Sequence, residues 1–404
     1  MRILDSLARA TRRLLRLAVL ISACGAAAAG DLAVTNVDLI PAPGAARVPD
    51  ATILIRGGRI AEVGTGLETA GLPVIDGGGR VASAGFWNSH VHLTDPALVE
   101  DPQPVLRDML LSYGFTSVVD TGSFLEDSLR LVAAIESGRL DGPRVWLANG
   151  SFVHTGGTPA YLPGITLPEL AAPAEAKPAV DAYLDAGAQG IKLFSGSFMS
   201  PTETILMRPA VIRAVADAAH ARGSFVMAHP TDRDGLVNAV ENGVDVVVHT
   251  APPAGPLGDG LVRSMLARDV ALIPTLKLWR WELARAGVPE DGIRAFEAAG
   301  VAQLGEYHRA GGEVLFGTDV GYMRDYDTAA ELRLMARAGM DWIAIHHALT
   351  RNPARRFAGE SGAVEPGAPG DLVLLGSDPA VDVAAFADVV MTIRGGRVVH
   401  ERAR

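Results

Sequence analysis

The sequence predicts an α/β protein in which a (β/α)8 TIM barrel carries a small β-sandwich built from both chain ends. Three observations favour this fold. Eight short apolar runs alternate with helical stretches, polar residues cluster where the runs end, and one turn sequence occurs near both ends of the chain. Near-continuous apolar strands that alternate with helices are typical of a parallel sheet covered on both faces.

Residues 1–29 have the pattern of a secretory signal peptide rather than a buried amphipathic helix. An Arg-rich start precedes an apolar run of about 13 residues, which is too short for a comfortable membrane span and ends in small residues. We therefore expect an exported protein, periplasmic or extracellular. Residues 21–24 resemble a bacterial lipobox, which would make Cys24 a lipid anchor, whereas cleavage near Ala29 would remove Cys24. Residues 12–13 form a partial twin-arginine signal.

The β-sandwich is expected from residues 31–84 and 363–404. Near the start, β-rich segments at 31–40, 51–55 and 59–63 are separated by glycine turns at 57–58 and 77–79; near the end, similar segments occupy 371–375 and 389–393. The motif Ile-Arg-Gly-Gly-Arg-Ile at 55–60 nearly recurs as Ile-Arg-Gly-Gly-Arg-Val at 393–398. The recurrence indicates that both chain ends meet in one unit.

The barrel is expected from residues 85–362. Helical patterns such as 105–113, 209–221 and 329–337 separate its strands, which we place at 85–92, 116–121, 144–149, 190–194, 225–229, 246–249, 271–274 and 314–319. In such barrels the chemistry lies at the C-terminal ends of the strands.

Six metal-binding or ionisable side chains stand near these strand ends. His90 and His92 close the first strand, and alternate residues of a strand share one face, so both imidazoles can point into the barrel. A chance His-x-His pair is the alternative for these two alone. Four further strands place a group at the same end: Lys192, His229, His249 and Asp319.

This set, in this order, resembles the amidohydrolase superfamily of metal-dependent hydrolases. The segments 85–93 (Gly-Phe-Trp-Asn-Ser-His-Val-His-Leu), 316–321 (Phe-Gly-Thr-Asp-Val-Gly) and 367–373 (Gly-Ala-Pro-Gly-Asp-Leu-Val) are similar to its first-strand motif, its last-strand motif and its return into the sandwich. The spacing is most similar to that of the imidazolonepropionase- and prolidase-like members. One departure is Asn88, where the family usually has Asp in a position next to the ligands.

The resemblance implies a centre of two divalent ions. His90, His92 and Asp319 would hold the buried ion, and His229 and His249 the more exposed one. Lys192 would bridge both ions as N6-carboxylysine. Zn²⁺ suits this set of nitrogen and oxygen ligands, and Fe, Ni, Co or Mn can replace it.

The lysine chemistry can also be argued from the residues. An ammonium has no lone pair for a metal, but burial beside cations lowers the pKa of a lysine and frees its amine to capture CO2. The carbamate then offers two oxygens to two ions. Arginine cannot do this, and the chain uses arginine almost throughout, since its only lysines are Lys177, Lys192 and Lys277.

The expected reaction is hydrolysis of a C–N bond in an amide, a cyclic amide or a dipeptide-like substrate. A hydroxide bridging the two ions would attack the carbonyl carbon, with Asp319 as general base and then general acid. An ester or lactone would meet the same machinery. The sequence is also compatible with a one-metal deaminase of the superfamily, in which Lys192 would hardly matter, and with a non-catalytic binding lipoprotein of this fold.

Substrate contacts are expected from loops at the same barrel face. His154 follows the third strand, and Tyr322 and Arg324 follow Asp319, where they could grip an anionic group; a solvated loop is the alternative for His154. We interpret Lys277 as either a site residue or a surface lysine, and His346 as structural or exposed.

The partner is expected to be a small molecule. Nucleic acid is excluded because the net charge is -10 and no basic run follows residue 16. Large barrels of this kind often pair, so a homo-oligomer is one possibility, and the sequence leaves the oligomeric state open.

Overall fold

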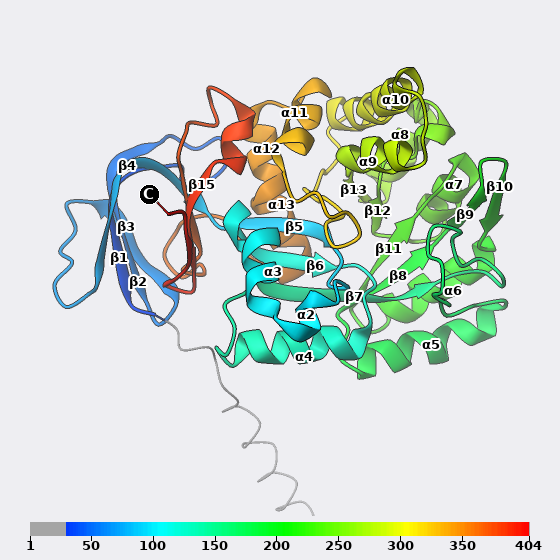
Figure 1. Cartoon of the computed structure of the whole chain (residues 1–404), viewed down its shortest axis with the longest axis horizontal. Coiled ribbons are helices and arrows are strands. Elements are labelled where there is room, and N and C mark those ends of the chain that lie inside the picture. Colours follow the sequence, from blue (N-terminus) through cyan, green and yellow to red (C-terminus); the bar gives the residue numbers. More distant parts are fainter. Residues whose placement is uncertain (1–29, 404) are drawn as a thin grey trace, which may run out of the picture.

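The computed structural model describes residues 30–403, and the expected signal segment with Cys24 lies outside the described residues. The described chain forms a strand-rich unit at one end and a larger barrel surrounded by helices at the other (Figure 1). Within residues 30–403, no helix combines the length and the apolar character needed to cross a membrane.

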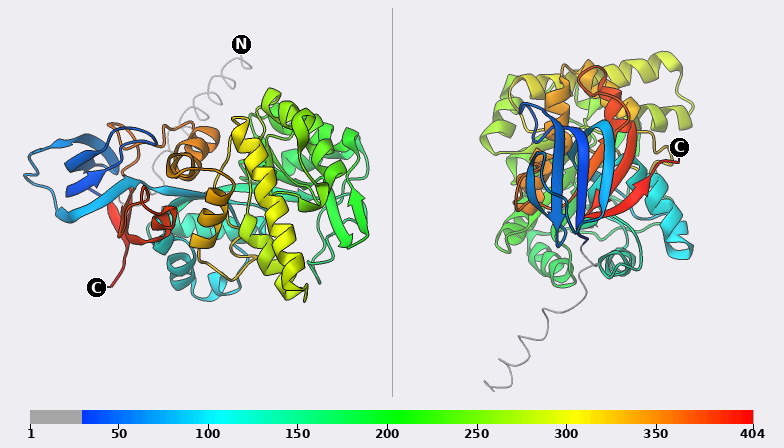
Figure 2. Two further views of the ribbon diagram at one scale, coloured as in Figure 1. Left: turned by 90° about the horizontal axis from the view of Figure 1, so that it is seen from above. Right: turned by 90° about the vertical axis from the view of Figure 1, so that its left-hand side faces the viewer.

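Both chain ends supply strands to one seven-stranded sheet, which faces the viewer in the right panel of Figure 2. Its order is β16-β15-β14-β4-β1-β2-β3, and Leu372 of the C-terminal part pairs directly with Ala84 of the N-terminal part. The meeting of the two ends is therefore confirmed. Because the strands form a single hydrogen-bonded sheet, the β-sandwich stays a prediction. The strands are β1 (Leu32–Leu39), β2 (Val48–Arg56), β3 (Arg59–Thr65), β4 (Val74–Ala84), β14 (Leu372–Leu375), β15 (Val389–Arg394) and β16 (Arg397–Glu401).

The glycines at 77–79 do not form the expected turn. They lie inside β4, where Thr35 pairs with Asp76 but Val37 pairs with Arg80, so β4 bulges away from β1. Gly78 and Gly79 adopt φ of +63° and +70°, which suits glycine in a bulge. The turn prediction was wrong because a glycine run marks positive φ equally well in a turn or in a bulge. The other expected turn, at 57–58, does connect β2 to β3.

The larger unit is a nearly closed parallel barrel. Its seven-stranded sheet has the order β13-β12-β11-β8-β7-β6-β5. The eighth expected segment, 314–319, joins both edges through single bridges, Leu272 to Val314 and Val91 to Val320, rather than through a full strand. The barrel strands are β5 (Phe86–Val91), β6 (Phe115–Asp120), β7 (Arg144–Phe152), β8 (Gly190–Phe194), β11 (Phe225–His229), β12 (Val246–Val248) and β13 (Ala271–Ile273). A hairpin of β9 (Gly196–Ser200) and β10 (Glu203–Leu206) follows β8.

Helices surround the barrel (Figures 1 and 2). The expected helical segments 209–221 and 329–337 appear as α6 and α11, whereas 105–113 divides into α3 and the 3-10 turn η1 (Leu111–Tyr113). The helices are α2 (Ala97–Glu100), α3 (Pro102–Met109), α4 (Leu125–Glu136), α5 (Pro173–Asp185), α6 (Pro209–His220), α7 (Arg233–Glu241), α8 (Gly258–Ala267), α9 (Leu276–Arg285), α10 (Glu290–Arg309), α11 (Ala329–Arg337), α12 (Trp342–Leu349) and α13 (Arg351–Pro353).

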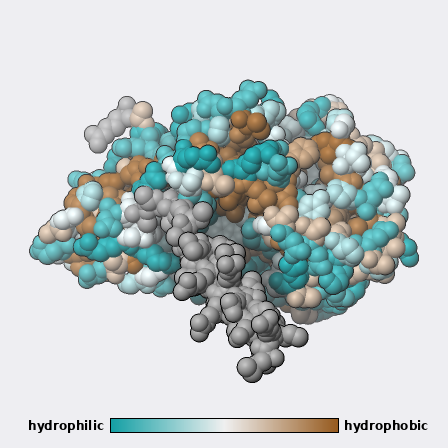
Figure 3. All heavy atoms as spheres, turned by 90° about the horizontal axis from the view of Figure 1, so that it is seen from below, coloured by the Kyte–Doolittle hydropathy of each residue, from teal (hydrophilic) through white to brown (hydrophobic). Residues whose placement is uncertain are grey.

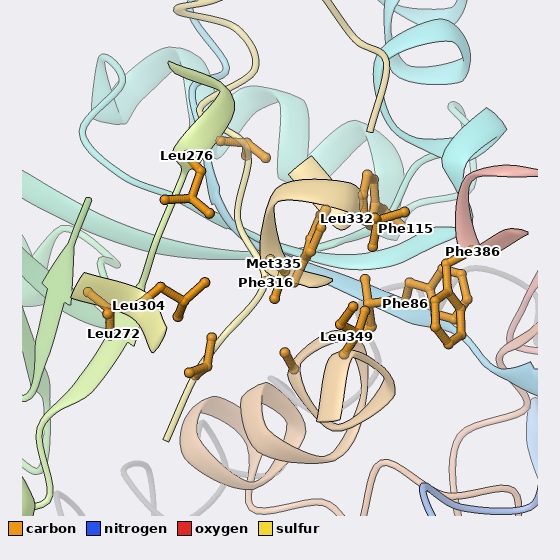
Figure 4. Packing of buried hydrophobic residues seen from close by; sticks show 14 of the residues in the cluster. Phe86, Phe115, Leu272, Leu276, Leu304, Phe316, Leu332, Met335, Leu349 and Phe386 are labelled. Carbon is orange, nitrogen blue, oxygen red and sulfur yellow. The ribbon is translucent and has the colours of Figure 1, made fainter. Parts of the chain in front are cut away.

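Apolar side chains fill the barrel below the expected site. Near the strands' N-terminal ends, Trp87 packs on Trp146 with ring centroids 4.5 Å apart, and Phe357 contacts Trp87 and Phe225. Beyond the barrel, Phe86 meets Phe386 and Phe115 stacks on Phe316 (Figure 4). These contacts fix the strands whose opposite ends carry the polar residues.

The face of the molecule in Figure 3 is mostly hydrophilic, with apolar residues showing in separate areas between polar ones. The exposed large apolar side chains of residues 30–403 come from widely separated elements: Val74, Val99, Phe124, Ile165, Leu266, Val381 and Val398.

Candidate metal centre

Three groups from three strand ends converge at the C-terminal mouth of the barrel. His90, His249 and Asp319 each present one ligand atom, and these atoms all lie within 4.8 Å of one another. All three residues are buried. Because parallel strands end at one edge of the barrel, residues far apart in the sequence become neighbours.

The other two expected histidines join this cluster. His92 Nε2 lies 2.9 Å from Asp319 Oδ1, and the His229 ring centroid lies 4.6 Å from that of His249. The His90 ring is 4.7 Å from the His249 ring and 5.2 Å from the His92 ring. Four imidazoles and one carboxylate thus surround a common space. His92 is the most accessible of them, with 21% of its side chain exposed.

Burial sets the protonation of the cluster. It lowers the pKa of His90 to about 4, and it lowers the pKa of His229 and His249 well below the usual value, so all three are neutral near pH 7. Burial alone would raise the pKa of the Asp319 carboxyl, but the neighbouring His90 and His92 hold that pKa well below its usual range. Neutral imidazoles beside an ionised carboxylate are the forms that bind a cation.

Several polar atoms here have no protein partner. Both ring nitrogens of His90 and Asp319 Oδ1 are buried without a hydrogen bond, although His90 Nε2 is only 3.2 Å from Asp319 Oδ1. Burying such atoms unpaired is costly, and a bound cation would satisfy them. The residues present therefore fit a divalent metal ion.

Lys192 lies at the same strand ends and is 2% exposed. Its Nζ lies 5.5 Å from the centroid of the Phe194 ring, which packs with its centroid 5.0 Å from that of His229. Burial lowers the pKa of the Lys192 amine to about 8, against the opposing charges of Asp319 and Asp120. This lysine can therefore lose its proton far more readily than an exposed one.

The backbone around the carboxylate is strained and tightly packed. Asp319 has φ of +65° and His249 has φ of +71°, values that side chains other than glycine rarely adopt. A Cβ on Gly317 would lie 2.9 Å from His90 Cβ, and one on Gly321 would lie 1.7 Å from the His92 carbonyl oxygen. The two glycines let the Asp319 segment approach the first strand.

Asn88 joins the same two segments. Its amide nitrogen donates to Thr318 Oγ1 at 2.6 Å, and its oxygen accepts from the backbone N–H groups of Thr318 and His90. The residue that departs from the family pattern therefore positions the Asp319 segment against His90.

Two groups near the centre were missed by sequence reasoning. Asp120 ends β6, is fully buried, and accepts hydrogen bonds from the hydroxyls of Ser123 and Ser128. Thr275 Oγ1 lies 2.6 Å from His249 Nδ1. The position of Asp120 at a strand end was a usable indication, whereas Thr275 meets His249 through the pairing of β12 with β13, which a local sequence pattern does not contain.

Aromatic side chains line the mouth. Tyr161, from the loop after β7, lies with its ring centroid 6.3 Å from that of His229 and 5.8 Å from that of Tyr322. Tyr322 in turn packs against Trp281, and Arg285 lies over both rings. Tyr161 was not predicted, because a loop residue carries no strand or helix pattern.

The expected substrate residues differ in their surroundings. Tyr322 lies at the mouth, but its hydroxyl donates to Glu282 and accepts from Arg285. His154 is partly exposed and its Nδ1 is 3.3 Å from the Thr155 carbonyl oxygen. Arg324 is exposed. Their roles toward a substrate stay predictions.

Two further residues have structural contacts. Lys277 is buried, and its Nζ bonds the carbonyl oxygens of Asp325 and Asp327, so it fixes the loop after Asp319 and is not the surface lysine of one interpretation. His346 is buried beside Phe386, and its Nε2 lies 2.6 Å from Ser83 Oγ. The structural interpretation of His346 is confirmed.

Comparison with known proteins gives matches over most of the chain. The sequence profile described as "Amidohydrolase family" matches residues 81–399. An uncharacterized protein of Mycobacterium tuberculosis is 30% identical over 196 residues, which are 46% of this chain and 51% of that protein. The chain thus spans about half the length of the curated relatives it matches.

Two solved structures are similar over nearly the whole chain. A putative prolidase from Bifidobacterium longum has a TM-score of 0.79 and 25% identity, with 92% of this chain and 94% of that chain covered. A Xaa-Pro dipeptidase with bound methionine in its active site has a TM-score of 0.80 and 20% identity, with 92% of this chain and 100% of that chain covered.

Proposed function

The chain belongs to the amidohydrolase family, and from that premise we propose that it is a metal-dependent hydrolase that cleaves a C–N bond in a small molecule. One observation carries the proposal. His90, His249 and Asp319 converge within 4.8 Å, and burial and neighbouring charges hold them in the protonation states that bind a metal.

The proposed centre holds two divalent ions, Zn²⁺ first among the candidates. His90, His92 and Asp319 would hold one ion, His229 and His249 would hold the other, and carboxylated Lys192 would supply a ligand to both. The ring distances between neighbouring imidazoles, all about 5 Å, support a shared centre. The low pKa of the buried Lys192 amine supports its carboxylation, because only the neutral amine captures CO2.

The chain's own residues then have defined tasks. When bound, divalent ions supply Lewis-acid polarisation of a carbonyl and a lower pKa for water. Asp319, ionised and buried, accepts a proton at a carboxylate oxygen and returns it to the leaving nitrogen. The surrounding burial excludes bulk water and strengthens these electrostatic interactions. Entry is from the side of His92, the most exposed ligand.

Dipeptide-like amides are the first substrate class to test. The support is the structural likeness to the putative prolidase and the Xaa-Pro dipeptidase. Esters and lactones remain a second class, because the same carbonyl chemistry applies to them.

The test is metal analysis joined to a substrate panel of Xaa-Pro dipeptides, N-acyl amino acids, hydantoins and lactones. We expect about two ions per chain and metal-dependent turnover of at least one C–N substrate. Lys192→Ala should remove one metal equivalent and most activity. Retained activity in that variant would favour a one-metal deaminase, and full metal binding without any turnover would favour a binding protein.

A further inference from the structure

Thr275 occupies an unusual position between β13 and α9. It is the residue before the helix, where a threonine side chain normally caps the first free N–H groups. Here its hydroxyl makes no such cap; Oγ1 donates to the Pro274 carbonyl oxygen at 2.9 Å and lies 2.6 Å from His249 Nδ1. The backbone is left-handed, with φ of +41°, which is strained for a β-branched residue.

This arrangement fixes the tautomer of His249. A hydroxyl has one proton; with that proton on the Pro274 carbonyl, Oγ1 accepts the hydrogen bond from His249 Nδ1–H. The lone pair of the neutral ring is then on Nε2, the nitrogen left to face the centre. Among the centre's four imidazoles, His249 is the one whose ring nitrogen bonds a side chain outside the cluster.

The missing helix cap comes from another helix. Glu331 of α11 is fully buried, and its two carboxylate oxygens accept from the backbone N–H groups of Leu276 at 2.8 Å and Lys277 at 2.7 Å. These are the first two N–H groups of α9, and a capping threonine would serve the second or the third, so Glu331 takes over the N–H of Lys277. Glu331 therefore frees the Thr275 hydroxyl for His249 and holds the first turn of α9 in place.

The same turn also contacts the segment that follows Asp319. Lys277 Nζ bonds the Asp325 carbonyl oxygen at 3.1 Å and the Asp325 carboxylate at 2.8 Å. One helical turn thus contacts both the His249 side chain and the loop after the carboxylate ligand.

We propose that Thr275 and Glu331 are positioning residues that orient His249 for metal binding. Thr275 fixes the protonated nitrogen and the ring plane, and Glu331 holds Thr275 in its strained conformation. The inference rests on the proposed function, since it assigns His249 to a metal ion. It concerns ion affinity and makes no demand on the identity of the substrate.

The test compares Thr275→Val with Thr275→Ser in the full chain. Valine keeps the shape and removes the hydroxyl, whereas serine keeps the hydroxyl. Stripped protein is dialysed against graded free Zn²⁺ and bound metal is measured per chain. We expect Thr275→Val to weaken one of two binding steps about 10–100-fold, with Thr275→Ser close to wild type. Glu331→Gln, which loses one acceptor, should weaken the same step less.

Unfolding of the metal-free variants separates orientation from folding. Without metal, Thr275→Val should have nearly the same free energy of unfolding as wild type. Its metal affinity should differ from that of wild type by more. Unchanged affinity in Thr275→Val, or equal loss in the valine and serine variants, would overturn the inference while leaving the proposed function intact. Wild-type protein that binds no metal would instead overturn the proposed function.

Discussion

At the level of single residues, burial separates the ionisable groups of the centre into two kinds. His90, His229 and His249 lose their protons because a charged ring is poorly solvated inside the barrel, whereas Asp319 keeps its charge through its neighbouring histidines. A site prepared in this way needs little proton release before a cation binds. In the proposed centre, both metal binding and proton transfer would depend on the Asp319 carboxylate.

Replacing Asp319 with Asn tests this dependence. The amide keeps the size of the side chain but cannot accept a proton as a base, so we expect kcat/KM to fall about 10²–10⁴-fold, together with weaker metal binding. Steady-state kinetics and metal analysis measure both effects. Asp327→Asn, an exposed change in the same loop, serves as the control and should leave both near wild type. Activity within a few-fold of wild type in Asp319→Asn would contradict the assigned role.

The buried side chain of His346 should make the free energy of unfolding depend on pH, independently of the metal centre. Burial, with a smaller effect from His347, lowers the pKa of His346 to about 3. Between pH 6.5 and 3 the unfolded chain takes up this proton and the folded chain does not. The free energy of unfolding should therefore fall on acidification, by about 1.4 kcal/mol per pH unit from this group.

The comparison variant for this effect is His346→Gln, which cannot titrate. Denaturant unfolding of both proteins at pH values from 7 to 4 should give a shallower pH dependence in the variant. Parallel curves would show that His346 takes up its proton at the same pH in the folded and the unfolded chain, which would contradict the prediction.

At the level of elements, the barrel closes through backbone hydrogen bonds and two glycines rather than through a regular eighth strand. The last segment reaches its neighbours by single bridges, and Gly317 and Gly321 allow it to lie against the first strand. The His90 carbonyl oxygen accepts from Asp319 N–H at 2.9 Å, and the Val320 carbonyl oxygen accepts from His92 N–H at 2.8 Å. Backbone hydrogen bonds and close packing at the two glycines thus hold the segment that carries Asp319.

A Gly321→Ala substitution measures the importance of this contact. The new Cβ would lie 1.7 Å from the His92 carbonyl oxygen, at φ of +97°, so the Asp319 segment must move. We expect a loss of stability of about 3 kcal/mol and weaker metal binding. Gly311→Ala has a similar φ of +84° with nothing within 4 Å, and should cost about 1 kcal/mol without affecting metal. Equal effects of the two changes, measured by unfolding and metal titration, would refute the packing argument.

At the level of the whole molecule, arginines tie the sheet to the base of the barrel. Arg144, at the start of β7, makes a two-bond ion pair with the nearly buried Asp371, which also accepts from Gly395 N–H. Arg394 and Arg397 of the recurring motif pair with Glu136 and Asp141. The Arg-Gly-Gly-Arg motif occurs twice in the chain, and the arginines of its C-terminal copy form ion pairs with residues of the barrel.

We expect Arg144→Met to lower the free energy of unfolding by about 2–4 kcal/mol, because Asp371 would be left buried without its cation. Metal affinity should be unchanged, since Arg144 lies at the strand end opposite the centre. Urea unfolding and metal titration test the two halves of this prediction. Arg130→Met, whose ion pairs are exposed on α4, is the matched control and should change stability by less than about 1 kcal/mol. Loss of metal binding in Arg144→Met would mean that the two barrel ends are coupled.

The features that could be predicted from the sequence are those that depend on hydrophobic periodicity and on where the strands end. The barrel strands, the junction of both chain ends and the convergence of His90, His92, His229, His249 and Asp319 followed from where apolar runs stop. Three kinds of feature were beyond it. Tyr161 lies on a loop, Glu331 reaches α9 from another helix, and the glycines at 77–79 form a bulge instead of a turn. Each depends on tertiary contacts that local patterns do not contain.

The direct pairing of Ala84 with Leu372 has a consequence for biosynthesis. β4 emerges from the ribosome about 290 residues before its partner β14, so at 5–20 residues per second its outer edge waits roughly 15–60 s for that partner. During this interval the nascent chain exposes an open strand edge, the kind of surface that recruits wrong partners or holding chaperones. The glycine bulge at 77–79 lies just before the residues of β4 that pair with β14, which are 81–84. The waiting edge is therefore short, and short edge strands associate less readily with growing chains.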